Sequence, residues 1–476
     1  MSSSIGDLPL RIRRRLRRLV NSAAKAVVSE DKRINATTWD LFGTYLRSRS
    51  FAALAKAVRG WPRLDPLVAY YQPKYPALSE TFIRREISAL RAAGVQVHVF
   101  TLELGDQSLL DPAELAGVTQ FGPEDPAAGR AWVGHVFRRD PSLVIALALW
   151  IVRCGHESWW RRDFHLMLQA GQLAFALHRA KVTHVHAPWA NRDSIVAFVA
   201  SRLIGATFTV QARASEIHRT ISGRGIADRV RFAEFIITNS EYNQRYLKSI
   251  LDRDAPPVHV VRNGLDCTRF LAPDRGEKAG ESFRLLAVGR LVEPKGFTYL
   301  LEACRMLRDR GHDVECDIVG GRVDPMDTVT WIELQLLHDS SGLGDHVRFT
   351  GPQSFEQVLA RLRAADAFVL PCVRARDGSH DITPNSLIEA MAMQLPVIST
   401  TSGAIPEIVE HEISGLLVPP ADAESLADAI ERVMLDASLR VRLGRAARAR
   451  VEERFDAHRN ARNRIALLQS LLSKRS

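Results

Sequence analysis

The repeated alternation of buried strands with amphipathic helices constrains the fold of this chain more than any other feature. An apolar run at 67–71 predicts a buried strand, and a polar loop and a helical pattern follow it. Ile83, Ile87 and Leu90 lie on one face of that helix, and alternating valines at 95–99 predict the next strand. A strand, a helix and a second strand in this order form the βαβ unit of a parallel sheet, whose ligands bind beyond the carboxyl ends of the strands.

A second α/β pattern begins at 283–288, after a linker at 272–282 that is rich in charge, glycine and proline. In a chain of 476 residues, two such patterns predict an α/β protein with two Rossmann-like parallel-sheet domains. The loop after the first strand has no Gly-x-Gly-x-x-Gly, which disfavours a dinucleotide-binding oxidoreductase. The expected parts are a basic, helical N-terminal extension at 1–66, a first domain at 67–271, a second domain at 283–440 and C-terminal helices at 441–476.

The composition is that of a soluble globular protein, with 46% hydrophobic and 25% charged residues. The five cysteines show no close pair, so neither a disulfide framework nor a metal knuckle is implied. We expect no signal peptide, and no apolar run reaches the length needed to span a bilayer. These features favour a cytoplasmic protein.

The formal net charge of +10 is unevenly spread, because six arginines crowd the segment 11–18. Apolar residues between them, among them Ile12 and Leu16, predict a basic amphipathic helix on an anionic membrane surface, on the inner face of the plasma membrane. A disordered basic tail is the alternative; nucleic acid is not expected, because nothing nearby resembles a base-reading module. A second apolar run, 143–152, fits either an interfacial helix or a helix buried in the first domain.

The segment 381–422 contains a helix start that suits a phosphate. Thr383 is a predicted N-cap and Pro384 fits the first helical position. Such a start offers free N–H groups and the positive end of the helix dipole. Asp381 and Glu389 bracket it, and a carboxylate two turns along the helix can accept both hydroxyls of a ribose. Taken alone, the same residues also fit a capped helix with a solvated glutamate.

Two cations follow the strand at 283–288. Arg290 and Lys295 lie on one loop at the strand's end, where they can face a diphosphate. A planar guanidinium and a compact ammonium can neutralise a leaving phosphate from two sides. As a charge pair alone, they would more often be solvated surface.

These segments together resemble the retaining GT-B glycosyltransferases of family 4, whose donor motif is two acidic residues separated by seven others. Asp381 stands where that family usually has Glu, and Glu389 matches. The loop and helix start that follow the first strand of the first domain, 75–82 with Arg85-Glu86, resemble the opening of enzymes that build bacterial exopolysaccharides such as colanic acid. The other matching pieces are Gly-Arg-Leu…Lys-Gly at 289–296, Asn-Gly-Leu-Asp at 263–266, Ser-Gly-Ala-Ile-Pro-Glu at 402–407 and Gly-Leu-Leu-Val-Pro-Pro at 415–420.

The resemblance implies a GT-B fold, with the donor on the second domain, the acceptor on the first, and the last helix crossing back to brace the first. Arg290, Lys295 and the amides of Asn385 and Ser386 would stabilise the leaving nucleoside diphosphate, beside Gly289. Glu389 would hold the ribose and Asp381 the hydroxyls of the transferred sugar. No cofactor or bound metal is expected, because the nucleotide-sugar is itself a substrate.

On the acceptor side of the cleft, the resemblance implies the residues Ser79, Glu80, His186, Gln211 and Glu216. Relatives usually carry histidine where Gln211 stands and Asp where Glu216 stands, which indicates a divergent subgroup. His184 and His186 lie on one face of a strand without a third ligand in view, so a metal site is not expected there.

The predicted function is therefore a retaining, metal-independent hexosyltransferase that moves a sugar from a nucleotide-diphosphate sugar to a saccharide acceptor. The acceptor is expected to be lipid-linked, in the synthesis of exopolysaccharide or another cell-surface glycan. Two alternatives stay open: a catalytically silent GT-B scaffold that binds a nucleotide or a partner at the membrane, and a GT-B sugar-nucleotide epimerase.

Overall fold

A computed structural model describes residues 67–77, 81–122, 126–154, 160–213, 215–218, 223–272, 282–322 and 327–473. The chain divides into two compact units, 1–59 and 60–476, and all the described residues belong to the second. The predicted N-terminal extension, together with Ser79 and Glu80, therefore lies outside the described residues.

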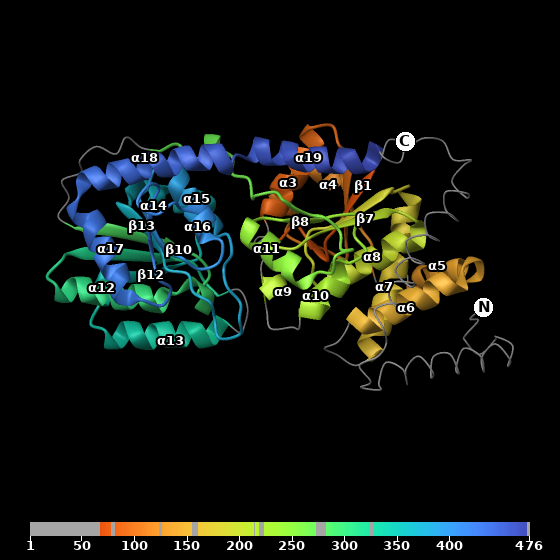
Figure 1. The fold of residues 1–476 in the computed structure, drawn as a ribbon, viewed down its shortest axis with the longest axis horizontal. Helices are drawn as coiled ribbons and strands as arrows, with labels where there is room; N and C mark the ends of the chain where they lie inside the picture. The colour runs from red at the N-terminus through yellow and green to blue at the C-terminus, as the bar shows by residue number, and fades with distance from the viewer. Residues whose placement is uncertain are drawn as a thin grey trace. The chain divides into compact units, whose positions relative to one another are not determined.

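The first domain is built on a parallel sheet of seven strands in the order β5-β3-β1-β6-β7-β8-β9 (Figure 1). The chain runs outward from β1 in one direction and from β6 in the other, so the switch point lies between these two strands. The strands are β1 (Val68–Tyr71), β3 (Val97–Thr101), β5 (Val118–Gln120), β6 (His184–Ala187), β7 (Thr207–Gln211), β8 (Ile236–Thr238) and β9 (Val258–Val260). A separate parallel pair joins β2 (Lys74–Tyr75) to β4 (Glu103–Leu104).

Helices connect these strands, as the βαβ pattern predicts. Ser240 caps α11 by accepting from the amide of Asn243, and Gly205 ends α8 in the left-handed conformation. The helices are α3 (Thr81–Ala92), α4 (Pro112–Ala116), α5 (Pro126–Arg139), α6 (Pro141–Cys154), α7 (Trp160–Arg179), α8 (Asp193–Ile204), α9 (Ser215–His218), α10 (Gly223–Val230) and α11 (Glu241–Ile250).

The apolar run at 143–152, which fitted either an interfacial or a buried helix, lies in α6. Leu147 and Trp150 are almost completely buried, and the Trp150 ring packs against Phe198 of α8 and Phe232. The run is therefore a buried helix rather than an interfacial one. No helix among the described residues is both long and apolar enough to cross a bilayer.

The second domain repeats the plan with six parallel strands in the order β12-β11-β10-β13-β14-β15. Its switch point lies between β10 and β13, where α/β proteins bind ligands beyond the carboxyl ends of the strands. The strands are β10 (Phe283–Val288), β11 (Val314–Val319), β12 (Val347–Gly351), β13 (Ala367–Leu370), β14 (Val397–Thr400) and β15 (Leu416–Val418).

The helices of this domain enclose a core formed by the buried strands and by the inward faces of α12, α15 and α17. Asp422 and Asp436 cap α17 and α18, and a Ser354–Gln357 capping box starts α14. The helices are α12 (Phe297–Asp309), α13 (Asp327–Ser340), α14 (Phe355–Ala364), α15 (Asn385–Ala392), α16 (Ile405–Ile408), α17 (Ala423–Leu435) and α18 (Ala437–Arg454), and α19 (Ala457–Ser473) follows them.

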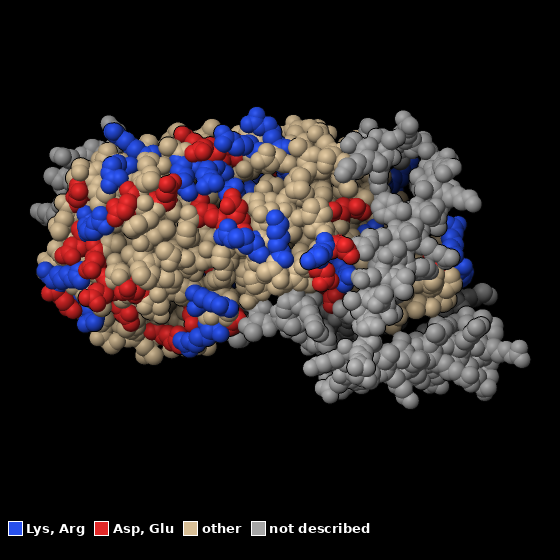
Figure 2. All heavy atoms as spheres, in the orientation of Figure 1, with Lys and Arg blue, Asp and Glu red and all other residues tan. Residues whose placement is uncertain are grey.

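The last helix, α19, packs against the first domain rather than the second (Figure 1). Its Ile465 and Leu468 join the same buried cluster as Ile83 and Leu90 of α3. At its start, a Cβ on Gly264 would lie 2.6 Å from Ala457 Cα, so the chain leaving β9 needs glycine here. On the face drawn in Figure 2, basic and acidic side chains of the described residues are interspersed.

Candidate active site

The candidate donor site is organised around the ion pair of Lys295 and Asp381. Lys295 ends a short 3-10 turn after β10, and Asp381 lies in the loop that leads into α15. The Lys295 Nζ lies 2.6 Å from Asp381 Oδ2, and both side chains are largely buried. Burial alone would lower the pKa of Lys295, but Asp381 and Cys372 together raise it above its ordinary value, so the ammonium stays charged.

Glycines bring the loops around this pair close together. A Cβ on Gly289 would lie 2.9 Å from Lys295 Cε, so the lysine stem crosses directly over this residue. Gly320 has a φ of +147°, and a Cβ there would lie 1.8 Å from the Gly289 carbonyl oxygen. Gly296 has a φ of +68° and approaches the Pro371 carbonyl equally closely. Because glycine has no side chain, these three positions leave the space in which the loops and the Lys295 stem pack.

Helix α15 begins one residue later than the sequence predicted. Pro384 is its N-cap, no side chain caps it, and Asn385 is its first residue. Thr383, the predicted cap, instead accepts a hydrogen bond from Asn239 Nδ2 of the first domain at 2.7 Å. The prediction was wrong because that tertiary contact uses the threonine hydroxyl.

The predicted donor residues on α15 take different positions. Ser386 Oγ donates to the Val288 carbonyl at the end of β10, at 2.8 Å, which ties the helix start to that strand. Asn385 is exposed, and its Oδ1 accepts from Asn263 Nδ2 at 3.1 Å. Glu389 is half-buried, and burial raises its pKa, while the charges of Arg85 and Lys295 lower it in part. Arg290 is exposed and near enough to Lys295 to oppose the rise in its pKa.

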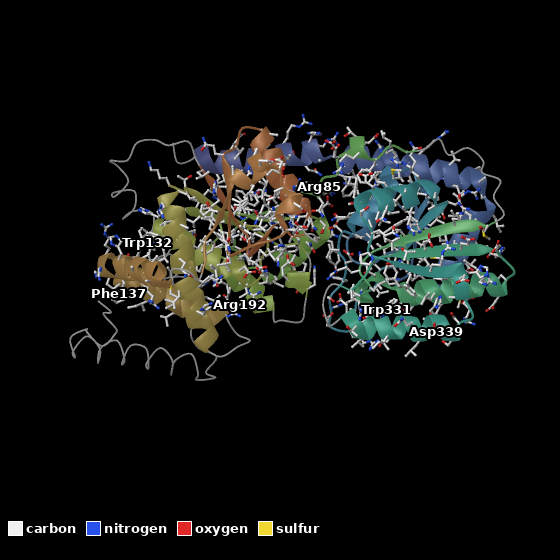
Figure 3. The ribbon with its side chains drawn as sticks, turned by 180° about the vertical axis from the view of Figure 1, so that it is seen from behind. Arg85, Trp132, Phe137, Arg192, Trp331 and Asp339 are labelled. Carbon is white, nitrogen blue, oxygen red and sulfur yellow. The ribbon has the colours of Figure 1, made fainter. Side chains whose placement is uncertain are left out.

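The structure therefore brings Arg290, Lys295, Asp381 and Glu389 to one end of the second sheet, around the β10–β13 switch point. Arg85 of α3, labelled in Figure 3, approaches this group from the first domain, because Glu389 acts on its pKa. Two positive side chains and a helix start can accept a diphosphate here, and two carboxylates can accept hydroxyl hydrogen bonds.

The first domain contacts the donor-site loops at further points. The carboxylate of Glu407, which precedes β15, accepts from the backbone N–H groups of Glu241 and Tyr242 at 2.8 and 2.5 Å. These amides belong to the first turn of α11, so Glu407 acts as a cap supplied by the other domain. His380, next to Asp381, stacks edge-on against His218 of α9, with ring centroids 4.6 Å apart. Burial lowers the pKa of His380 to about 4, so this pair is neutral at pH 7.

The described residues among those predicted for the acceptor side take different positions in the structure. His186 and Gln211 are buried and turn toward the carboxylate of Glu86 on α3. Gln211 Nε2 donates to Glu86 at 2.8 Å, whereas His186 Nε2 stays 3.9 Å away. Glu216 accepts from the backbone N–H of Arg213 at 2.6 Å and so supports the loop after β7.

Glu86 is the centre of a buried charged cluster that sequence reasoning missed. Arg213 Nη2 lies 2.7 Å from Glu86 Oε2, and Arg464 Nη1 lies 2.6 Å from Glu86 Oε1. Tyr70 also donates its hydroxyl to Glu86 at 2.6 Å. The Arg85-Glu86 dipeptide was part of the recognised motif, but nothing local in the sequence links it to Arg464 on the last helix.

The two histidines of β6 are engaged with threonines. His184 lies 2.8 Å from the hydroxyls of both Thr207 and Thr209, and His186 lies 2.8 Å from Thr209. Among the residues that the structure describes, no group of three or more His, Cys, Asp or Glu side chains is placed to hold a metal ion.

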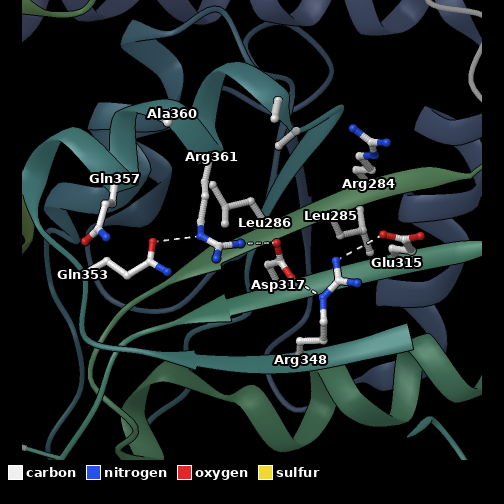
Figure 4. A pocket seen from close by; sticks show the side chains of 12 residues that line it. Arg284, Leu285, Leu286, Glu315, Asp317, Arg348, Gln353, Gln357, Ala360 and Arg361 are labelled. Atoms are coloured by element: carbon white, nitrogen blue, oxygen red, sulfur yellow. Dashed lines mark hydrogen bonds and ion pairs between the residues drawn. The ribbon is translucent and has the colours of Figure 1, made fainter. Parts of the chain in front are cut away.

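A wide pocket of about 530 Å³ lies elsewhere in the second domain, beside β11, β12 and α14 (Figure 4). Four of its charged side chains pair with one another: Arg348 with Glu315 and Asp317, and Arg361 with Asp317. Because none of the predicted donor residues lines it, we do not assign the donor to this pocket.

Two family models cover most of the chain. Residues 79–269 match the model described as Glycosyltransferase Family 4, and residues 270–450 match the model described as Glycosyl transferases group 1. The putative colanic acid biosynthesis glycosyltransferase WcaL of Escherichia coli (strain K12) is 29% identical over 424 residues, which are 85% of this chain and 100% of that protein. The amylovoran biosynthesis glycosyltransferase AmsK of Erwinia amylovora is also 29% identical, over 85% of this chain and 99% of its own length.

Among solved structures, HepE of Anabaena in complex with UDP-glucose is similar, with a TM-score of 0.64 at 18% sequence identity. The match covers 85% of this chain and 99% of that chain, and it confirms the predicted GT-B arrangement of two parallel-sheet domains. The two matched stretches adjoin one another, and this chain therefore belongs to the GT-B glycosyltransferases that combine a family 4 domain with a group 1 domain.

Proposed function

We propose that this protein is a retaining glycosyltransferase of exopolysaccharide synthesis, which transfers a hexose from a nucleotide-diphosphate sugar to a lipid-linked saccharide. The observation that carries this proposal is the convergence of Lys295, Asp381 and Glu389 at the switch point of the second sheet. The names of the relatives from E. coli and E. amylovora, in colanic acid and amylovoran biosynthesis, support the class of product.

The donor would bind with its diphosphate between Lys295, Arg290 and the start of α15. These groups supply two positive charges and free backbone N–H groups. Glu389, the fifth residue of α15, would accept the ribose hydroxyls. The complex of HepE with UDP-glucose, a protein of the same fold, supports a nucleotide-sugar as the donor class.

The Lys295–Asp381 pair would be exchanged for substrate contacts when the donor binds. The ammonium then faces the diphosphate, and the freed carboxylate accepts hydroxyls of the sugar. Both groups are already charged and largely buried in the pair, so the substrate replaces one set of charge-assisted bonds with another. This exchange lowers the cost of desolvating the site.

In the transfer step, the bond from the anomeric carbon to the diphosphate oxygen breaks as the acceptor hydroxyl attacks from the same face. The acceptor's proton passes to the leaving phosphate oxygen, and the anomeric configuration is retained. Lys295 and Arg290 stabilise the negative charge that develops on the diphosphate. The step needs no cofactor and no metal ion.

The proposed location is the inner face of the plasma membrane, where a lipid-linked acceptor would be presented. The six arginines between residues 11 and 18 support this placement, since a polybasic segment is attracted to anionic lipid.

The proposal is tested by measuring turnover of a panel of UDP- and GDP-sugars with a lipid-linked saccharide pool as acceptor, and by reading the anomeric configuration of the product by proton NMR. Lys295→Ala and Glu389→Ala should abolish transfer while leaving the fold intact. Lys248→Ala, an exposed lysine of α11, is the matched control and should keep wild-type turnover. Full activity in Lys295→Ala, or an inverted product, contradicts the proposal. Donor binding without transfer or hydrolysis would favour a silent scaffold.

A further inference from the structure

An arginine-lined cavity of about 50 Å³ lies in the first domain, apart from the groups assigned to the donor. It is enclosed by α3, the end of β7, the chain that leaves β9, and α19. Its floor is formed by the buried side chains of Arg213, Glu86 and Arg464, and its rim includes Arg85 and Asn263, which are half-buried.

The buried floor carries more positive than negative charge. Glu86 is a single carboxylate with a side-chain exposure of 6%, and it faces both Arg213 and Arg464, whose side chains are 6% and 7% exposed. Buried charges are costly unless each has a counter-charge. Arg85 at the rim adds a third guanidinium, on which the carboxylates of Glu389 and Asp266 act. An anion in the cavity would balance the excess positive charge of the buried floor.

One of these arginines has guanidinium donors to spare. The buried Nη1 of Arg464 is already paired, because it lies 2.6 Å from Glu86 Oε1. The guanidinium of Arg85, by contrast, makes no hydrogen bond or ion pair within the described part of the chain. Arg262 on the same rim donates to Glu241 at 2.7 Å. The half-buried Arg85 side chain can therefore donate to a ligand in the cavity.

The cavity lies on the acceptor's side of the site. Asn263 at its rim donates to Asn385 at the start of α15, and Arg85 is close enough to Glu389 to influence its pKa. The donor's diphosphate is already assigned to Lys295 and Arg290 on the second domain. A second anion on the facing wall therefore belongs to the other substrate.

We propose that this cavity binds the phosphoryl group that joins the acceptor saccharide to its lipid carrier. Its volume holds about four water-sized spheres, which is the size of a phosphoryl group with its oxygens. Arg85 donates to those oxygens, and planar guanidinium groups suit phosphate in particular. The assignment rests on the proposed function and names the class of acceptor that this wall selects.

The test uses the full chain with its donor pocket filled by saturating UDP or GDP, whichever raises its thermal stability more. Calorimetry then measures the binding of hexyl phosphate, inorganic phosphate, glucuronate and hexyl glucoside. The variant is Arg85→Met, which removes the rim guanidinium without disturbing the buried cluster. The matched control is Arg84→Met on the neighbouring position of α3, where the arginine is 42% exposed and pairs with Glu114 instead.

Hexyl phosphate should bind the wild type and Arg84→Met equally, and Arg85→Met at least about tenfold more weakly, as loss of a charge-assisted hydrogen bond predicts. Hexyl glucoside should not bind. The proposal is overturned if Arg85→Met binds hexyl phosphate like the wild type. It is also overturned if hexyl phosphate binds only in the absence of the nucleoside diphosphate, or if glucuronate binds in place of hexyl phosphate. Binding of inorganic phosphate without hexyl phosphate also overturns it, because the cavity would then exclude a linked phosphoryl group.

Failure of the donor assignment gives a different result. In that case neither UDP nor GDP stabilises the chain, while binding of hexyl phosphate through Arg85 is unaffected.

Discussion

Replacement of Glu86 by glutamine should destabilise the first domain strongly, because it leaves two buried guanidinium groups without a counter-charge. Burial alone would raise the pKa of Glu86, but Arg464 and Arg213 lower it from 4.5 to about 2. That difference corresponds to about 3 kcal/mol of folding free energy at pH 7. Removal of one partner from a buried ion pair costs about 3–5 kcal/mol in other proteins, which agrees with this magnitude.

The same pKa fixes the pH dependence. Because the folded-state pKa is below the unfolded value of 4.5, the stabilisation is fully present above pH 4.5 and is lost as the pH falls toward about 2. The stability gap between the wild type and Glu86→Gln should therefore be about 3 kcal/mol at pH 7 and about 2 kcal/mol at pH 3.5.

Urea unfolding of both proteins, followed by tryptophan fluorescence and circular dichroism, measures this gap. Glu234→Gln is the control, since Glu234 is a half-buried acid of the same domain whose carboxylate makes no hydrogen bond or ion pair within the described residues. The reasoning is refuted if Glu86→Gln loses less than about 1 kcal/mol at pH 7, or if the gap does not narrow on acidification.

Three further changes test separate parts of the account. Gly289→Ala places a Cβ 2.9 Å from Lys295 Cε and should shift the ammonium from its position. The kcat should then fall about tenfold with little change in thermal stability. An unchanged kcat would show that the position of the lysine is not critical. Glu407→Gln weakens two charge-assisted hydrogen bonds to the start of α11 and should lower the free energy of unfolding by about 1–2 kcal/mol. An unchanged midpoint of thermal unfolding would show that these backbone N–H groups do not depend on the carboxylate. Deletion of residues 1–30 should reduce sedimentation with anionic liposomes, most clearly at low salt, and undiminished binding would remove this segment as an anchor.

The sequence predicted the fold well, because the fold depends on local patterns, and the roles of the donor-site residues stay predictions. Apolar runs mark the strands of both sheets, and the loops after them carry Arg290, Lys295 and Asp381 near the same sheet edge. The start of α15 was misplaced by one residue, since Thr383 is engaged by Asn239 of the first domain. A contact between the two domains cannot be predicted from local helix-capping preferences.

The acceptor side was less predictable. The resemblance predicted that His186 and Gln211 line the cleft. In the structure, both side chains point toward the buried carboxylate of Glu86. The partner that completes this cluster, Arg464, comes from the last helix, and its role depends on how that helix packs across the first domain. Ser79 and Glu80 lie outside the described residues and remain predictions.

If Lys295 and its neighbours form a nucleotide-sugar site, the affinity of the chain for nucleoside diphosphates depends on Lys295. Calorimetric titration of UDP and GDP into the wild type, Lys295→Ala and Lys248→Ala provides that measurement. We expect one of the two nucleotides to bind the wild type and Lys248→Ala equally, and to bind Lys295→Ala at least about tenfold more weakly. Equal affinity in Lys295→Ala and the wild type would contradict it.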